Sequence, residues 1–147
     1  MALAHLLDNL GWGRVITIDI NQEGVPSIVR GHPRITLLQG DACEEFENVR
    51  TIVGSEKPVL IIEDSSHTYE NTLNVLRKYC SLVTPGSYFI VEDSICHHGL
   101  EEGPSPGPYE AIAQFAAENS SFEVDRSKEA FLITWNPTGY LKRKGSS

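Results

Sequence analysis

Apolar residues along the chain follow two patterns, one spaced as in amphipathic helices and one running continuously as in buried strands. The helical pattern predicts helices over residues 2–10, 22–30, 43–53, 69–82 and 108–119. The strand pattern is rich in β-branched and aromatic residues, and it predicts strands over residues 14–20, 34–39, 58–63, 87–92, 122–125 and 130–135. Helices and strands therefore alternate for most of the chain.

This alternation predicts an α/β fold, a mostly parallel Rossmann-like sheet between two layers of helices. The strands at 122–125 and 130–135 are expected to form an antiparallel hairpin at the edge of the sheet. Residues 94–107 contain several glycines and prolines and are expected to form a long loop, of the kind that often covers an active site. The polar tail from Lys142 to Ser147 is expected to fray.

Composition favours an ordinary soluble protein. The 147 residues suit a single domain over positions 1–147, and the formal net charge of −8 argues against nucleic acid or an anionic membrane as a partner. No apolar stretch approaches the roughly 20 residues that span a bilayer, and the first residues do not resemble a secretory signal. Cys43, Cys80 and Cys96 lack the spacing of a zinc site, and reduced thiols suit a cytoplasmic protein.

Acidic residues follow two of the most apolar predicted strands. Asp64 follows the run 59–62, and the pair Glu92-Asp93 follows the run 87–91. The carboxyl ends of strands in an open α/β sheet meet at the edge where ligands bind. Converging carboxylates repel one another unless a cation lies among them, so Asp64, Glu92 and Asp93 predict a divalent-cation site, most plausibly for Mg²⁺. A helix cap at Asp64 and a turn at Asp93 are the alternative, and Glu63 could replace Asp64 as a ligand.

His67 lies three residues after Asp64, at the rim of the predicted cation site. A neutral imidazole there could take a proton from a substrate hydroxyl, although a lone histidine in a loop is often only a solvated side chain. Iron-dependent hydroxylation needs two histidines and one carboxylate, usually with one histidine two residues from the acid. No histidine in the chain has an acid two residues further on, so the sequence gives that chemistry little support.

Two further acids follow the earlier predicted strands. Asp19 ends the strand at 14–20, a place where an acid accepts hydrogen bonds from ribose hydroxyls in nucleotide-binding sheets. Asp19 could equally cap the next turn. Asp41 follows the strand at 34–39 and could contact an adenine amino group or cap the next helix, and Glu44 three residues later favours the cap.

Several motifs resemble the cephalosporin hydroxylase family, and together they cover most of the chain from Gly13 to Arg143. The matching stretches are Ile61-Ile62-Glu63-Asp64-Ser65-Ser66-His67-Thr68, residues 82–93, Pro106-Gly107-Pro108-Tyr109-Glu110-Ala111, residues 122–125 and residues 136–143. Members of this family look like Mg²⁺-dependent methyltransferases that use S-adenosylmethionine. The resemblance therefore implies a class I methyltransferase fold and methyl transfer to a hydroxyl of a sugar, an antibiotic-like natural product or another small molecule.

The resemblance also implies roles for individual residues. Asp64, Glu92 and Asp93 would hold the metal, and Asp19, Asp41 and Asp64 would form the cofactor side, with the first two facing ribose and adenine. In the related catechol O-methyltransferase arrangement, a lysine three residues after the first metal acid is the base. His67 has that offset and is the expected catalytic base.

The chain departs from the family pattern at the N-terminus. Family members carry a strand and a Gly-rich turn ahead of the first helix, and no such pattern precedes Asp19. The sequence therefore predicts a shortened domain, and an unpaired sheet edge would favour self-association as a homo-oligomer. The main alternative to an O-methyltransferase is a non-catalytic methyltransferase-like subunit or binding module, and a true oxygenase is a third option.

Overall fold

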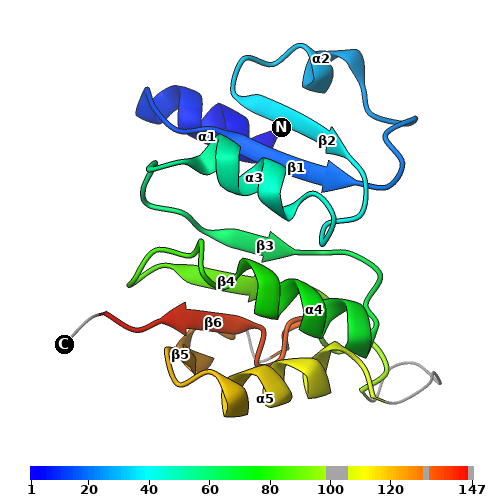
Figure 1. Ribbon diagram of the computed structural model, residues 1–147, viewed down its shortest axis with the longest axis vertical. Helices are drawn as coiled ribbons and strands as arrows, with labels where there is room; N and C mark the ends of the chain where they lie inside the picture. Colours follow the sequence, from blue (N-terminus) through cyan, green and yellow to red (C-terminus); the bar gives the residue numbers. More distant parts are fainter. Residues whose placement is uncertain (99–105, 131–132, 146–147) are drawn as a thin grey trace. The chain divides into compact units, whose positions relative to one another are not determined.

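The structure is a computed structural model that describes residues 1–98, 106–130 and 133–145. The chain forms two compact units, Met1–Gly54 and Ser55–Ser147, and each is described by itself. Figure 1 shows their elements coloured along the sequence. The prediction of one domain over the whole chain stays a prediction.

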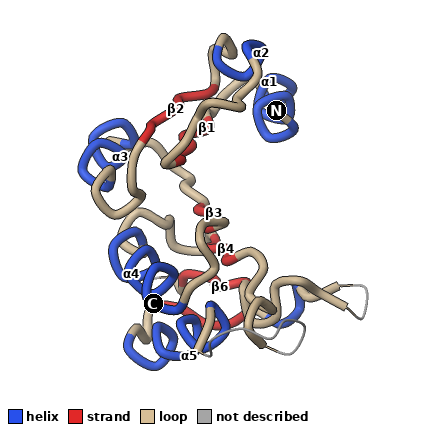
Figure 2. Tube along the Cα trace, turned by 90° about the vertical axis from the view of Figure 1, so that its right-hand side faces the viewer, coloured by secondary structure: helices blue, strands red, loops and turns tan. Residues whose placement is uncertain are grey.

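The first unit contains two strands and three helices. In chain order they are α1 (Ala2–Leu10), β1 (Val15–Asp19), α2 (Ser27–Arg30), β2 (Ile35–Gln39) and α3 (Phe46–Val53). Helix α1 ends as expected at Gly11, whose φ of 79° gives the left-handed turn that glycine adopts without strain. Strands β1 and β2 are parallel and in register, with Asp19 opposite Gln39. Helices α1 and α2 lie on one side of this strand pair, and α3 lies on the other (Figure 2).

The second unit is built around a four-stranded sheet. Its elements are β3 (Ile61–Glu63), α4 (Tyr69–Tyr79), β4 (Tyr88–Val91), α5 (Pro108–Glu118), β5 (Phe122–Val124), a single 3-10 turn (Arg126–Lys128) and β6 (Tyr140–Arg143). The strand order is β3-β4-β6-β5, with β3 and β4 parallel and β6 antiparallel to both of its neighbours. The parallel pairs and the antiparallel edge agree with the expected mostly parallel α/β sheet.

Helices α4 and α5 lie side by side on one face of this sheet (Figures 1 and 2). The core between them is formed by fully buried apolar side chains from both layers, namely Leu76, Phe89, Ile112, Phe115 and Leu141. Burying a leucine or phenylalanine side chain contributes about 1.5–3 kcal/mol each. This core holds β3 and β4 in place, and the ends of these two strands carry the candidate site.

The expected C-terminal hairpin is wrong in its second strand. Residues 131–132 lie outside the described part of the chain, and Ile133–Trp135 are not in a strand. The partner of β5 is β6, which places Leu141 in the core and includes Lys142 and Arg143, two residues expected to fray. The guanidinium group of Arg143 donates to the carbonyl oxygens of Ser81, at 2.9 Å, and of Val83, both in the segment that follows α4, so a long-range contact orders this part of the tail.

Three helices are shorter than expected by three residues or more. Helix α2 begins only at Ser27, directly after Pro26, α3 begins at Phe46 and not at Cys43, and α4 ends at Tyr79 and not at Leu82. Of the predicted loop at 94–107, residues 99–105 lie outside the described residues. Among the residues that the structure describes, none of the helices is both long and apolar enough to cross a lipid bilayer.

Candidate active site

The ends of β3 and β4 bring Asp64, Glu92 and Asp93 to one edge of the sheet. The two strands are parallel, with Glu63 opposite Val91, and the backbone N–H of Glu92 donates to the carbonyl oxygen of Glu63 at 2.8 Å. Asp64 is therefore the first residue beyond β3, and Asp93 lies two residues beyond β4. This edge is the one where ligands bind in open α/β folds.

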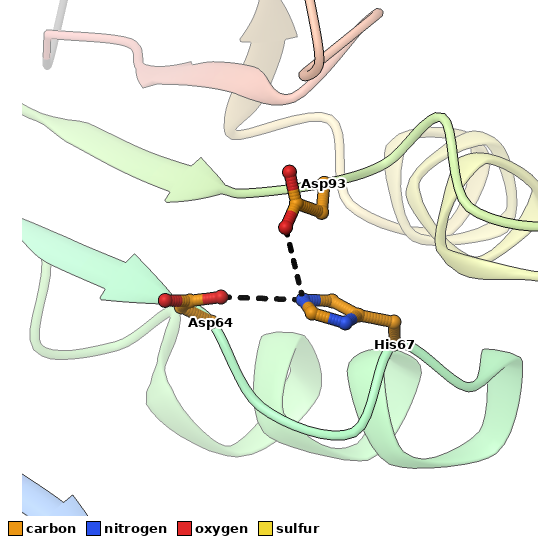
Figure 3. Close-up of side chains that lie close together, drawn as sticks. All are labelled: Asp64, His67 and Asp93. Carbon is orange, nitrogen blue, oxygen red and sulfur yellow. Dashed lines mark hydrogen bonds and ion pairs between the residues drawn. The ribbon is translucent and has the colours of Figure 1, made fainter.

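Asp64, His67 and Asp93 form a compact group at this edge (Figure 3). The Nε2 atom of His67 lies 3.2 Å from Oδ1 of Asp64 and 3.8 Å from Oδ2 of Asp93. One candidate ligand atom from each residue lies within 4.8 Å of the others. The sequence placed His67 at the rim of the acidic site, and the structure puts its imidazole between the two carboxylates.

The backbone at two of these residues adopts a conformation that side chains disfavour. His67 has a φ of 51° and Asp93 a φ of 48°, both in the left-handed region. Non-glycine residues there cost on the order of 1–2 kcal/mol, and such residues cluster at functional sites. Surrounding contacts therefore have to hold both residues in place.

Asn136 supplies one of these contacts at Asp93. Its side-chain oxygen accepts the backbone N–H of Asp93 at 2.8 Å, and the hydroxyl of Ser94 donates to the carbonyl oxygen of Pro137 at 2.7 Å. The segment before β6 therefore fixes the turn that follows β4. Asn136 was not singled out as a site residue in the sequence, where its only signal was its place at the start of the matching stretch 136–143.

Glu63 and Glu92 lie in different environments from Asp64, His67 and Asp93, the central group of the site. Glu63 is only 3% exposed, and burial raises the pKa of its carboxyl group although Ser65 donates a hydrogen bond to it. Glu92 is half-buried, and its pKa is also raised, first by burial and then by the negative charges of Asp64 and Asp93. Glu92 is therefore repelled by the same negative charges, but it is not one of the three converging side chains. Its role as a metal ligand stays a prediction.

Asp19 and Asp41 belong to the other compact unit, where Asp19 is the last residue of β1 and Asp41 lies two residues beyond β2, at the same edge of the parallel pair. Asp19 accepts the backbone N–H of Asn21 at 2.8 Å, and Asp41 accepts those of Cys43 at 2.8 Å and Glu44 at 3.2 Å. Both acids thus cap local turns, and Asp41 caps the turn that precedes α3 and not the helix itself, while both residues remain exposed. Their contacts to ribose and adenine stay predictions.

The donor set of the central group suits a hard divalent cation. Carboxylate oxygens are the preferred ligands of Mg²⁺, and the side chains of Asp64 and Asp93 are 57% and 44% exposed, so an ion can reach them from solvent. A mononuclear iron oxygenase uses two histidines and one carboxylate, whereas this group has the opposite ratio. Two anions held this close also leave a net negative site that a cation would neutralise.

Comparison with known proteins decides the family. The model of the family described as Rhamnosyl O-methyltransferase/CmcI matches residues 1–144. The chain belongs to this family. The resemblance expected from the sequence motifs is therefore confirmed.

Relatives of known name are rhamnosyl O-methyltransferases of mycobacteria. The protein from Mycobacterium tuberculosis is 28% identical over 137 residues, which cover 88% of this chain and 56% of the relative. The protein from Mycobacterium leprae is 29% identical over 138 residues, covering 89% of this chain and 59% of the relative. The chain thus spans little more than half the length of these relatives.

A solved structure described as cmcI-D160 Mg-SAM confirms the fold class. It superposes with a TM-score of 0.62 at 22% identity, covering 98% of this chain and 60% of the other. At this level of identity the likeness shows the α/β methyltransferase fold alone.

Proposed function

We propose that this protein is an S-adenosylmethionine-dependent, Mg²⁺-assisted O-methyltransferase acting on a sugar hydroxyl. One observation carries the proposal: in a chain of this family, Asp64, His67 and Asp93 converge at the carboxyl ends of β3 and β4. The names of the relatives support a rhamnose unit as the acceptor, and the neighbouring structure described with Mg and SAM supports both cofactors.

Each residue of the group has a chemical task in this proposal. Asp64 and Asp93 would hold the cation, with Glu92 close enough to contribute its charge. A bound divalent cation lowers the pKa of a hydroxyl group that it contacts. His67 would accept the proton as the acceptor oxygen attacks the methyl group, and the carboxylates beside its Nε2 atom would stabilise the imidazolium that forms.

Charge balance supports this division of labour. The methyl donor is a sulfonium cation, and transfer of the methyl group turns it into a neutral thioether while the hydroxyl proton leaves. The methyl-donor pocket would use Asp19 and Asp41, whose exposed carboxylates are available to ribose hydroxyls and an adenine amino group. Holding donor and acceptor in line would supply much of the remaining rate enhancement.

The test is a methyl-transfer assay with a rhamnoside acceptor. S-adenosylhomocysteine should form only when acceptor and S-adenosylmethionine are both present, EDTA should abolish its formation, and Mg²⁺ should restore it. Chelator-resistant transfer would contradict the metal-assisted mechanism. Calorimetry distinguishes the enzyme from the alternative of a non-catalytic binding module. Micromolar binding of S-adenosylhomocysteine supports the enzyme, and absence of binding at millimolar ligand contradicts the enzyme.

A further inference from the structure

The loop that joins β3 to α4 carries both Asp64 and His67, and it is held by a chain of hydrogen bonds outside the metal-binding group. The hydroxyl of Ser65 donates to the carboxylate of Glu63, the last residue of β3. The same oxygen accepts a hydrogen bond from the side-chain amide of Asn71 in α4, at 2.6 Å. Ser65 is thus fixed from the strand on one side and from the helix on the other.

The polarity of this chain is set by the chemistry of its members. The amide NH₂ of Asn71 can only donate, so the Ser65 hydroxyl accepts it with a lone pair and uses its one proton toward Oε1 of Glu63. Each group therefore has one role, and the arrangement has a single low-energy orientation. Ser65 follows Asp64 directly and precedes His67 by two residues, so its position constrains both.

Glu63 is the buried end of this chain of hydrogen bonds and anchors it. This carboxylate is 3% exposed, and its Oε2 atom has no hydrogen-bond partner among the described residues. Its bond to Ser65 is therefore a contact that the buried group cannot exchange for water. Leaving a buried acceptor unsatisfied is unfavourable, and this favours the conformation in which Ser65 stays in place.

We propose that the Glu63–Ser65–Asn71 chain positions Asp64 for divalent-cation binding and holds His67 beside it, with Asn71 as a positioning residue on α4. The inference rests on the proposed function, because it assumes that Asp64 and Asp93 bind a cation. It explains how a loop containing an exposed aspartate and a histidine of left-handed backbone keeps its geometry. Outer groups of this kind orient the ligands of metal sites.

The test measures Mn²⁺ affinity of the full chain by calorimetry or electron paramagnetic resonance, independently of methyl transfer. Asn71→Ala leaves the bond between Ser65 and the buried Glu63 intact, so the variant is expected to fold. Its dissociation constant for Mn²⁺ should rise ~10-fold. Asn74→Ala is the matched control, since Asn74 is an exposed asparagine on the same helix and should bind Mn²⁺ as the unmodified chain does.

A second pair of variants separates positioning from general stability. Ser65→Ala removes the bridging hydroxyl and should weaken Mn²⁺ binding, whereas Ser65→Thr keeps a hydroxyl and should restore it. Equal Mn²⁺ affinity of Asn71→Ala and the unmodified chain would overturn this inference alone. A fall in thermal midpoint that accounts for the lost binding would also overturn it, by assigning a structural role. Absence of Mn²⁺ binding in the unmodified chain would overturn both this inference and the proposed metal site.

Discussion

His67 and Asp93 share a backbone conformation that most residues avoid, and each is held in it by neighbouring contacts. Histidine and aspartate tolerate positive φ better than β-branched or bulky residues do. The backbone N–H of Asp93 is fixed by Asn136, and the imidazole of His67 lies beside Asp64. His67 and Asp93, two of the four described non-glycine residues with positive φ, are thus residues whose side chains meet, and strained residues of this kind cluster at functional sites.

Replacing His67 with alanine tests whether the imidazole is a base or a metal ligand. If His67 is the base, His67→Ala should lower kcat by ~10²-fold or more while the affinity for Mn²⁺ stays unchanged. A large loss of Mn²⁺ affinity would instead make it a ligand, an unchanged rate would refute the role as base, and an unchanged rate together with unchanged Mn²⁺ affinity would refute both roles. His5→Ala, an exposed histidine on α1, is the control and should behave as the unmodified chain. Steady-state kinetics and Mn²⁺ titration give the two readouts.

Part of this site could be predicted from the sequence. Asp64 and Asp93 follow apolar strands, and parallel strands have to end at the same edge, so their meeting follows from the pattern alone. Asn136 and Asn71 could not be found in this way. Their contributions are single hydrogen bonds to residues distant in the sequence or in the next element, and such contacts leave no periodic signal.

At the scale of elements, the strand assignments fail where composition and tertiary pairing disagree. The run 130–135 is apolar and β-branched, and local preference therefore predicts a strand. The residues Tyr140–Arg143 carry two basic side chains at the end of the chain but pair with both β4 and β5. Pairing is decided by burial of Leu141 and by the carbonyl contacts of Arg143, which a local pattern does not contain.

Gly139 connects this strand arrangement to the site. A Cβ atom at Gly139 would lie 2.3 Å from the carbonyl oxygen of Val91, and the backbone N–H of Val91 donates to the carbonyl oxygen of Gly139 at 2.8 Å. Because Val91 directly precedes Glu92 and Asp93, any displacement here moves the acids. Position 139 therefore has to be glycine, because the backbone of residue 139 packs directly against the backbone of Val91.

The variant Gly139→Ala should be destabilised by about 1–3 kcal/mol, as in other overpacked sites, and should bind Mn²⁺ more weakly. Chemical denaturation and Mn²⁺ titration measure the two effects. Gly145→Ala is the matched control, because a Cβ there meets no atom within 4 Å. Wild-type stability in Gly139→Ala would show that the end of β4 can shift freely, contrary to the tight contact described above.

At the scale of the whole molecule, the formal net charge of −8 sets the background for any cation effect. A chain of this charge repels itself when compact, and added salt of any kind screens the repulsion. Stabilisation by a divalent cation is evidence for a site only if it exceeds this general screening. A site-specific effect concerns the unit Ser55–Ser147, because all three residues of the central group belong to that unit.

Specific binding should appear as a shift in unfolding that depends on Asp64 and Asp93. At a free Mg²⁺ concentration about one hundred times its dissociation constant, binding to the folded state alone should add about 2.7 kcal/mol, which raises the unfolding midpoint by about 5–10 °C for a chain of this size. Scanning calorimetry at matched ionic strength in NaCl removes the screening contribution. The Asp64→Asn/Asp93→Asn variant keeps the size of both side chains and should respond equally to MgCl₂ and NaCl. An equal response of the unmodified chain to the two salts would mean that Mg²⁺ acts only on the overall charge.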